Sequence, residues 1–219
     1  NDFSFESFDA TYHLSVNEQE QNRPEMQVTE TLLALFPETD QNRGIKRSLP
    51  SSSYGDNPGL IEVQSVTDEN GYAREYEVIE EEGFTNLYIK KQDDSYVYGK
   101  QTYVIKYSQA WIIKSYKDST GDDEFYWDVN GTGWQQSFDR VSAKVTFDAE
   151  VQKHLLLDSV SCYKGASQSQ DACDESQVSK TQMSFVANNL AAGENLTIAI
   201  PFQAGALNTN GPDVSRSFA

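Results

Sequence analysis

The segment Phe8-Asp9-Ala10-Thr11-Tyr12-His13-Leu14-Ser15-Val16 alternates apolar and polar residues. This alternation places Phe8, Ala10, Tyr12, Leu14 and Val16 on one face, which is the period of a half-buried β-strand. A second apolar segment, Met26 to Phe36, follows a polar connection that ends in Pro24. The two segments therefore predict a hairpin with a long loop.

Strand-like segments recur along the rest of the chain, at 60–67, 72–80, 84–91, 101–113, 141–147, 155–163, 182–187 and 195–202. Glycine turns separate the first three, which we expect to form a meander. In the longest segment, one face carries Tyr103, Ile105, Tyr107, Gln109 and Trp111. The stretch 44–50 is expected to lead into a loop. About a dozen strands without a convincing helix predict an all-β fold, a mostly antiparallel β-sandwich assembly.

The length of 219 residues permits one large domain or two small ones. A fresh alternating set begins at Val141, so we predict an N-terminal β-sandwich unit over 1–137 and a second β unit over 138–204. The alternative is one continuous β domain. The polar segment 205–219 is expected to be a flexible linker toward a missing transmembrane segment.

Acidic residues dominate the charge: 17 Lys and Arg against 34 Asp and Glu, a net charge of −17. The acids are spread along the chain. Such a field repels phosphate backbones and anionic lipid headgroups, which argues against nucleic acid as a partner. The sequence contains no run of 18 apolar residues, so we expect no segment that spans a bilayer.

The two cysteines, Cys162 and Cys173, lack the spacing and the nearby histidines that a zinc site needs. We expect a disulfide; two free thiols are the alternative. Closing so short a loop contributes about 3 kcal/mol to the free energy of unfolding. A disulfide also indicates a compartment outside the cytosol. The acidic loop 118–124 offers weak calcium candidates in Asp118, Asp122 and Asp123, but it lacks EF-hand spacing. We therefore expect a solvated turn, with no metal and no cofactor.

The stretch Tyr126-Trp127-Asp128-Val129-Asn130-Gly131-Thr132-Gly133-Trp134 contains two of the three tryptophans. Alternation places Tyr126 and Asp128 on one face and Trp127 and Val129 on the other, before a glycine turn. Trp127 is then a core residue. Trp134 either closes the same core or stands at its rim as a platform for a sugar ring. Together with Trp111 and Tyr126, it is a candidate binding residue.

Catalytic residues are not indicated. A serine or cysteine hydrolase needs a histidine base near its nucleophile. The only histidines, His13 and His154, lie in predicted strands without a G-x-S-x-G elbow, and we expect both to be ordinary strand residues. A glycosidase needs only two carboxylates beside a cleft. Because the chain contains 34 acidic residues, a glycosidase site remains an alternative.

Four stretches, in this order, resemble a bacterial predicted-membrane-protein family, domain of unknown function 2207: Val28-Thr29-Glu30-Thr31, Gly44-Ile45-Lys46-Arg47-Ser48-Leu49-Pro50, Tyr126 to Trp134, and Leu190-Ala191-Ala192-Gly193-Glu194-Asn195-Leu196-Thr197. The similarity in order and spacing runs from about Phe8 to Leu207. In the second stretch the family usually carries an aromatic residue and then an Arg-Asp pair. Here Lys46 replaces the aromatic residue and Ser48 replaces the acid, so no role of that acid is carried over.

The resemblance implies an exported N-terminal ectodomain on the extracellular face of a bacterial membrane, anchored through segments absent here. It supplies no catalytic residues. We expect a non-enzymatic domain that binds an envelope component or a protein partner. The alternatives are a carbohydrate-binding β-sandwich module and a carboxylate-dependent hydrolase. A row of exposed aromatics favours the former, and two carboxyl groups about 5 to 9.5 Å apart in a cleft favour the latter.

Overall fold

The computed structural model describes residues 2–51, 60–81, 83–116 and 121–209, and their fold is all-β, as predicted. One layer is a seven-stranded sheet, with the order β12 (Glu175–Val178), β13 (Gln182–Leu190), β10 (Phe138–Phe147), β1 (Ser4–Asn17), β2 (Arg23–Phe36), β7 (Gly99–Ala110) and β4 (Ile61–Thr67). Short helical turns are η1 (Glu18–Glu20), α1 (Ala149–Gln152) and η2 (Leu157–Ser159).

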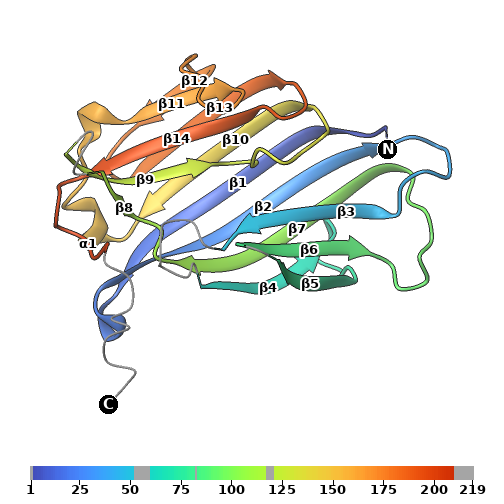
Figure 1. The fold of residues 1–219 in the computed structure, drawn as a ribbon, viewed down its shortest axis with the longest axis horizontal. Coiled ribbons are helices and arrows are strands. Elements are labelled where there is room, and N and C mark those ends of the chain that lie inside the picture. The colour runs from blue at the N-terminus through green and yellow to red at the C-terminus, as the bar shows by residue number, and fades with distance from the viewer. Residues whose placement is uncertain (1, 52–59, 82, 117–120, 210–219) are drawn as a thin grey trace.

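Two smaller sheets form the opposite layer. The first has the order β11 (Ser161–Gly165), β14 (Asn195–Phe202), β9 (Asp123–Asp128) and β8 (Lys114–Ser115), and the second has the order β3 (Gly44–Pro50), β6 (Phe84–Lys90) and β5 (Tyr76–Glu81). Both sheets lie over the same face of the large sheet, with β3 and β9 on the sides that face each other (Figure 1). The opposite layer is therefore split between these two strands.

One apolar cluster fills the space between the layers. The alternation predicted around Phe8 is present in β1, where Phe8, Tyr12 and Leu14 are each at most 1% exposed. β14 is buried along its whole length because it lies in the middle of its sheet and over the large one. The predicted hairpin is also present, since β1 pairs with β2 antiparallel from Ser4 to Asn17.

The predicted meander is wrong. β4 joins the large sheet beside β7, whereas β5 and β6 join β3 in the second small sheet. A glycine turn reverses the chain, but it does not fix which sheet the next strand enters. The stretch 44–50, expected to lead into a loop, is strand β3.

Three local expectations also need correction. The strand predicted over 101–113 ends at Ala110, and Trp111 leaves its ladder with a positive φ of 58°, so it does not continue the alternating face. His154 follows helix α1 in a turn rather than a strand. In the segment 155–163, Leu155 forms only an isolated bridge to Phe202, the 3₁₀ helix η2 follows, and β11 starts at Ser161.

The large sheet continues across the predicted boundary at 137/138. β10, from the second predicted unit, pairs in parallel with β1 from the first and antiparallel with β13. Within the predicted linker, Gly205 donates its backbone N–H to Asp123 and Leu207 is buried. Residues 210–219 of that linker lie outside the described residues.

The predicted disulfide is confirmed: Cys162 and Cys173 are bonded, with their Cα atoms 5.4 Å apart. It ties β11 to the segment that leads into β12. Among the described residues, no helix has the length and apolar character needed to cross a membrane.

Candidate functional site: a groove between two sheets

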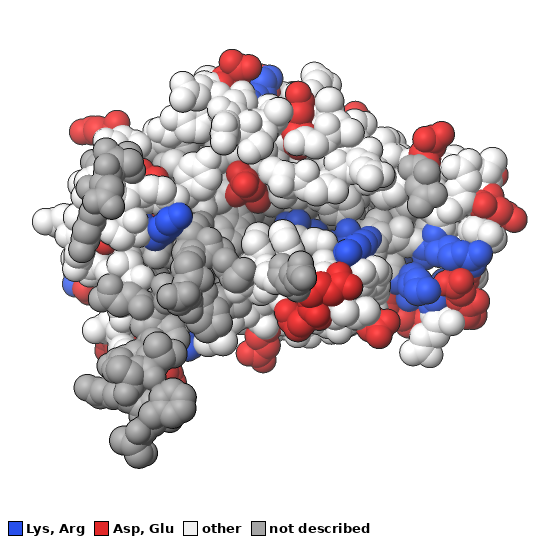
Figure 2. All heavy atoms as spheres, in the orientation of Figure 1, with Lys and Arg blue, Asp and Glu red and all other residues white. Residues whose placement is uncertain are grey.

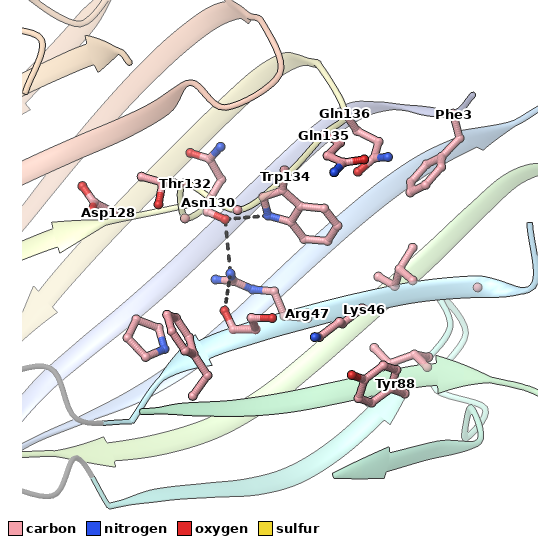
Figure 3. Close-up of a pocket in the computed structure, with 18 of the residues that line it drawn as sticks. Phe3, Lys46, Arg47, Tyr88, Asp128, Asn130, Thr132, Trp134, Gln135 and Gln136 are labelled. Atoms are coloured by element: carbon pink, nitrogen blue, oxygen red, sulfur yellow. Dashed lines mark hydrogen bonds between the residues drawn. The ribbon is translucent and has the colours of Figure 1, made fainter. Parts of the chain in front are cut away.

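A groove of about 910 Å³ separates the two smaller sheets. Residues 43–48 line one side, from β3 and the residue before it, and residues 126–128 and 130–136 line the other, from β9 and the loop that follows. Lys46 and Tyr88 lie on the β3 side, with Asp128, Thr132 and Gln135 opposite them and Arg47 between (Figure 3). The groove is thus bounded by two strands and one loop.

A buried ion pair lies beneath the groove. The Arg47 guanidinium donates from Nε to Glu30 Oε2 at 2.8 Å and from Nη2 to Glu30 Oε1 at 2.7 Å. The Tyr107 hydroxyl donates to the same carboxylate at 2.9 Å. Glu30 is 0% exposed and Arg47 is 3% exposed. This bidentate geometry compensates both charges for the loss of water.

Burial and the Glu30 charge shift the pKa values of both Arg47 and Tyr107. Burial lowers the pKa of Arg47, but the Glu30 carboxylate more than offsets this, so the pKa is raised above its ordinary value. Burial, and then the Glu30 charge, raise the pKa of Tyr107. Arg47 therefore stays charged and Tyr107 stays neutral at physiological pH.

The Asn130 backbone carbonyl joins the ion pair to the opposite wall. It accepts hydrogen bonds from Arg47 Nη1 at 3.2 Å and from the Trp134 indole N–H at 2.7 Å (Figure 3). The Asn130 side chain accepts from the Leu196 N–H and donates to the Glu194 carbonyl. Asn130 is 0% exposed, so these bonds satisfy a fully buried polar residue.

Gly131 lies directly against the guanidinium. Its φ is +81°, and a Cβ placed there would lie 3.2 Å from Arg47 Nη1. Glycine adopts this conformation without steric cost and leaves room for Arg47. The turn that carries Trp134 can therefore pass close to the buried cation.

The four sequence stretches singled out above meet at this point. Glu30 comes from the first stretch, Arg47 from the second, Asn130 and Trp134 from the third, and Leu196 from the fourth. They lie up to 166 residues apart in sequence, from Glu30 to Leu196. One hydrogen-bonded cluster under the groove therefore connects them.

The groove reverses the charge balance of the chain. Four lining residues are cationic, Arg43, Lys46, Arg47 and Lys90, whereas Asp128 is the one acidic residue in the described lining. The whole chain carries twice as many acids as bases. Figure 2 shows Lys and Arg side chains along this hollow and acids scattered over the surrounding surface.

The cations at the rim are partly compensated. Arg43 and Lys90 both contact Asp94, at 3.2 and 2.7 Å, and Lys46 Nζ lies 3.7 Å from Glu81. These pairs are exposed, so each contributes little to stability. Tyr88 is the largest influence on Lys46 and raises its pKa, with a smaller contribution from Glu81. The Lys46 ammonium remains cationic and accessible to a ligand.

The N-terminal domain of a predicted membrane protein family (DUF2207) matches residues 9–202. The chain belongs to this family. The resemblance expected from the four stretches is thereby confirmed, and the domain is the N-terminal part of a predicted membrane protein. Its sequence matches none of the curated proteins.

Several solved structures have some similarity to this family domain. A mutant M1 zinc metallopeptidase from Deinococcus radiodurans has a TM-score of 0.46 and 9% identity, over 90% of this chain and 42% of that one. Leukotriene A4 hydrolase from Saccharomyces cerevisiae has a TM-score of 0.44 and 12% identity, over 90% and 29%. The chain spans less than half of each, and similarity at this level carries no statement about activity.

The structure brings two of the three candidate binding residues together. Trp134 and Tyr126 both line the groove, at 9% and 38% exposure, whereas Trp111 is 5% exposed and lies outside the lining. Trp134 packs edge-on against Phe5 and Phe138, so its ring belongs mostly to the core. Trp127 is in the core as predicted, stacked 5.5 Å from Phe125.

The calcium candidates do not form a described cluster. Asp118 lies outside the described residues, and Asp123 is 1% exposed in β9, where it accepts from the Gly205 N–H. Within the described ranges, no group of three or more His, Cys, Asp or Glu side chains is arranged to hold a metal ion.

His13 lies in strand β1, as expected, and its ring contacts two polar side chains. Its Nδ1 lies 2.8 Å from Thr146 Oγ1 and its Nε2 lies 2.7 Å from Asp148 Oδ1. His13 lies on β1, Thr146 on β10, and Asp148 directly after β10. None of these three residues lines the groove. His13 and Asp148 are about half exposed, at 46% and 54%.

The Glu30–Arg47 pair was not predicted, although the alternation of both strands signals it. Glu30 shares a face of β2 with Val28 and Leu32, and Arg47 shares a face of β3 with Ile45 and Leu49. Strand alternation alone thus places both charges on core-facing positions, where an unpaired charge is rarely found. Two opposite charges on core faces would have predicted a buried pair.

Proposed function

We propose that this chain is a non-enzymatic recognition domain on the extracellular face of a bacterial membrane, and that its groove binds a protein partner. Membership in a predicted membrane protein family supports attachment to a membrane. The disulfide between Cys162 and Cys173 supports an oxidising compartment outside the cytosol.

The groove is the observation that carries this proposal. Its volume of about 910 Å³ is that of a ligand site, and it combines apolar and cationic lining. Phe84, 47% exposed, adds an apolar side chain to the lining beside Pro50. Such an exposed aromatic side chain within a cavity of this size can pack against a side chain of a bound partner.

Hydrolysis is less well supported. A carboxylate-dependent hydrolase requires two carboxyl groups facing one cleft. Asp128 carries the only carboxyl group in the described lining. Its Oδ1 accepts hydrogen bonds from Asn195 and Thr197, both at 2.8 Å. Asp128 is therefore held by two donors rather than poised beside a second acid.

Carbohydrate binding is the second candidate, because the exposed Tyr126 ring lines the groove. A sugar platform requires an accessible aromatic face. Trp134 and Trp111 are both buried, so Tyr126 lacks a tryptophan neighbour for this purpose.

Site-directed photo-crosslinking tests the proposal. A photo-reactive side chain replaces Gln135, which is exposed at the groove, or Lys144, which is exposed on β10 and outside the lining. Each variant is irradiated with envelope preparations of the producing bacterium. We expect a protein adduct at Gln135 that excess unlabelled domain abolishes, and no matching adduct at Lys144. Apart from the crosslink itself, the captured protein should be neither cleaved nor modified.

Three results would contradict this function. Equal labelling at both positions, or none at either, would remove the groove as the binding site. A glycan adduct would favour the second candidate. A captured protein that has been cleaved or otherwise modified would overturn the non-enzymatic assignment.

A further inference from the structure

We propose that the groove binds an extended, acidic peptide segment of the partner, which pairs as an additional strand with the free edge of β3. This inference rests on the proposed function and names its ligand class. It is carried by the shape of the groove, by the backbone of β3 and by the charge of the lining.

The groove runs along a strand edge. Residues 43–48 line it consecutively, including both core-facing Arg47 and outward-facing Lys46. Side chains of a strand alternate between its two faces, so neighbours on opposite faces can border one cavity only if the cavity follows the edge. The same holds across the groove for residues 126–128 of β9.

The register of β3 shows which backbone groups face the groove. Ser51 donates its N–H to the Gly83 carbonyl, which continues the antiparallel β3–β6 ladder beyond the pair Pro50 and Phe84. Because hydrogen-bonded pairs alternate in such a ladder, Arg47 and Leu49 bond to β6. The N–H and C=O of Lys46 and the N–H of Ser48 therefore point away from β6, toward the groove.

Two side-chain contacts agree with this parity. The Ser48 carbonyl accepts from Arg47 Nη1 at 3.2 Å, and the Pro50 carbonyl accepts from Gln109 at 3.0 Å. Both carbonyls must face away from β6 to be reached. β3 is the terminal strand in the order of its sheet, and no described strand pairs with its outer edge. An extended peptide supplies the alternating donors and acceptors that this edge requires.

Charge selects the kind of peptide. A lysine on an edge strand discourages indiscriminate pairing, because most added strands would bury its charge without a partner. Lys46 is 45% exposed near the centre of β3, 3.7 Å from the exposed Glu81. Arg43 and Lys90 also line the groove and share one acid, Asp94, whereas Glu30 neutralises Arg47. A strand that carries Asp or Glu satisfies Lys46, whereas a basic strand is repelled. The remainder of this strongly acidic chain would repel the same peptide elsewhere.

The outward-facing backbone groups of β3 favour a peptide over an anionic polysaccharide. A polysaccharide can contact Lys46, but it has no repeating amides to pair with the N–H groups of Lys46 and Ser48. Peptide and polysaccharide therefore differ at the backbone of β3, which an experiment can address directly.

Binding is measured by fluorescence anisotropy with the full chain and an array of ten-residue peptides of graded acidic content. Polygalacturonate is the anionic control without amides. We expect the acidic peptides to bind, affinity to fall with salt, and polygalacturonate to compete weakly. Lys46→Glu should shift the preference from acidic to basic peptides.

Proline provides the backbone test. Ser48→Pro removes an N–H that faces the groove and is tolerated on an edge strand, whereas Ser48→Ala removes only the hydroxyl, which donates to Asn86. We expect Ser48→Pro to weaken binding by about tenfold and Ser48→Ala to change it little. A thermal unfolding curve for each variant checks that it folds.

Hydrogen exchange of the unmodified chain is an independent measurement. The Lys46 and Ser48 amides should exchange rapidly in the free protein and slow down by at least about tenfold on saturation with the acidic peptide. The Arg47 amide, already bonded to β6, is the internal control and should be slow in both states.

Strand addition is overturned if an acidic peptide binds but leaves the Lys46 and Ser48 amides unprotected, or if polygalacturonate binds as tightly as any peptide. It is also overturned if no peptide of the array binds. A specific adduct at Gln135 together with any of these results leaves the proposed function standing. If the adduct at Gln135 is also absent, both strand addition and the proposed function are overturned.

Discussion

The Glu30–Arg47 pair organises the region under the groove. Its two charges come from strands of opposite layers, and the Asn130 carbonyl connects the guanidinium to Trp134. The desolvation of two charges is large, so the pair adds little net stability relative to two apolar residues. Removal of one partner, however, leaves the other charge buried alone.

This asymmetry predicts the outcome of a double-mutant cycle. Arg47→Met and Glu30→Met should each lower the free energy of unfolding by about 3 to 5 kcal/mol, and the double variant by clearly less than the sum. Urea unfolding measures all four proteins. Arg140→Ala, which breaks the exposed pair with Asp9, is the control and should cost at most about 1 kcal/mol. Small, additive losses at Glu30 and Arg47 would contradict the buried pair.

Tyr103 predicts how stability depends on alkaline pH. Burial raises its pKa to about 12 in the folded chain, so folding favours the neutral phenol. That contribution is complete below the ordinary pKa of about 10 and is lost as the pH rises toward 12. Its hydroxyl has no hydrogen-bond partner among the described residues, so Tyr103→Phe should not be destabilising at pH 7.

At pH 11, Tyr103→Phe should be more stable than the unmodified chain by about 1 kcal/mol, because the variant has no phenol to ionise there. Urea unfolding at pH 7, 9 and 11 measures the difference. An identical pH dependence of both proteins would show that Tyr103 does not contribute to alkaline unfolding.

At the scale of elements, the edge strands are the least supported parts of the fold. All four residues of β12 are exposed, and this strand pairs only with β13. The disulfide links the segment before β12 to Cys162 in β11, and Lys164 adds an ion pair to Asp174 at 2.8 Å. Covalent closure therefore acts where apolar burial is smallest.

Removal of this disulfide should affect β12 first. The double variant Cys162→Ala and Cys173→Ala should lose about 3 kcal/mol of stability, by analogy with loops of similar length. Hydrogen exchange should rise in β12 while β1 and β2 stay protected. Two reactive thiols in the unfolded, unreduced chain would instead show that the bond is absent.

For the whole molecule, the central pairing of β1 with β10 joins strands far apart in the sequence, with Phe5 opposite Phe138. β1 lies in the first predicted unit and β10 in the second, and the large sheet contains strands from both. A cut at 137/138 would expose a new edge on β1 and remove β14, the strand that pairs with β9 in the opposite layer.

We therefore expect the fragment 1–137 to lack a cooperative unfolding transition, in contrast to the full chain. Near-ultraviolet circular dichroism during heating makes the comparison. A cooperative transition in the fragment, with dispersed amide signals in its NMR spectrum, would establish the first predicted unit as an independent domain.

Alternation along the chain was sufficient to predict the all-β class, the β1–β2 hairpin and the core position of Trp127. These features depend on the period of side chains along a strand, which is a local property. The disulfide was also predictable, since only two cysteines are present and no metal spacing competes for them.

Neither the partners of each strand nor the groove could be read from local pattern. The sequence favours a meander for β4, β5 and β6, but β4 and β5 lie in different sheets because long-range burial, rather than turn chemistry, selects the neighbour. Similarly, 44–50 resembles a short link to a loop until β6 and the Glu30 carboxylate stabilise it as β3. The residues needed for strands and a core are thus written in the chain. The free edge of β3, and the groove beside it, exist only because distant strands assemble into two separate sheets over a third.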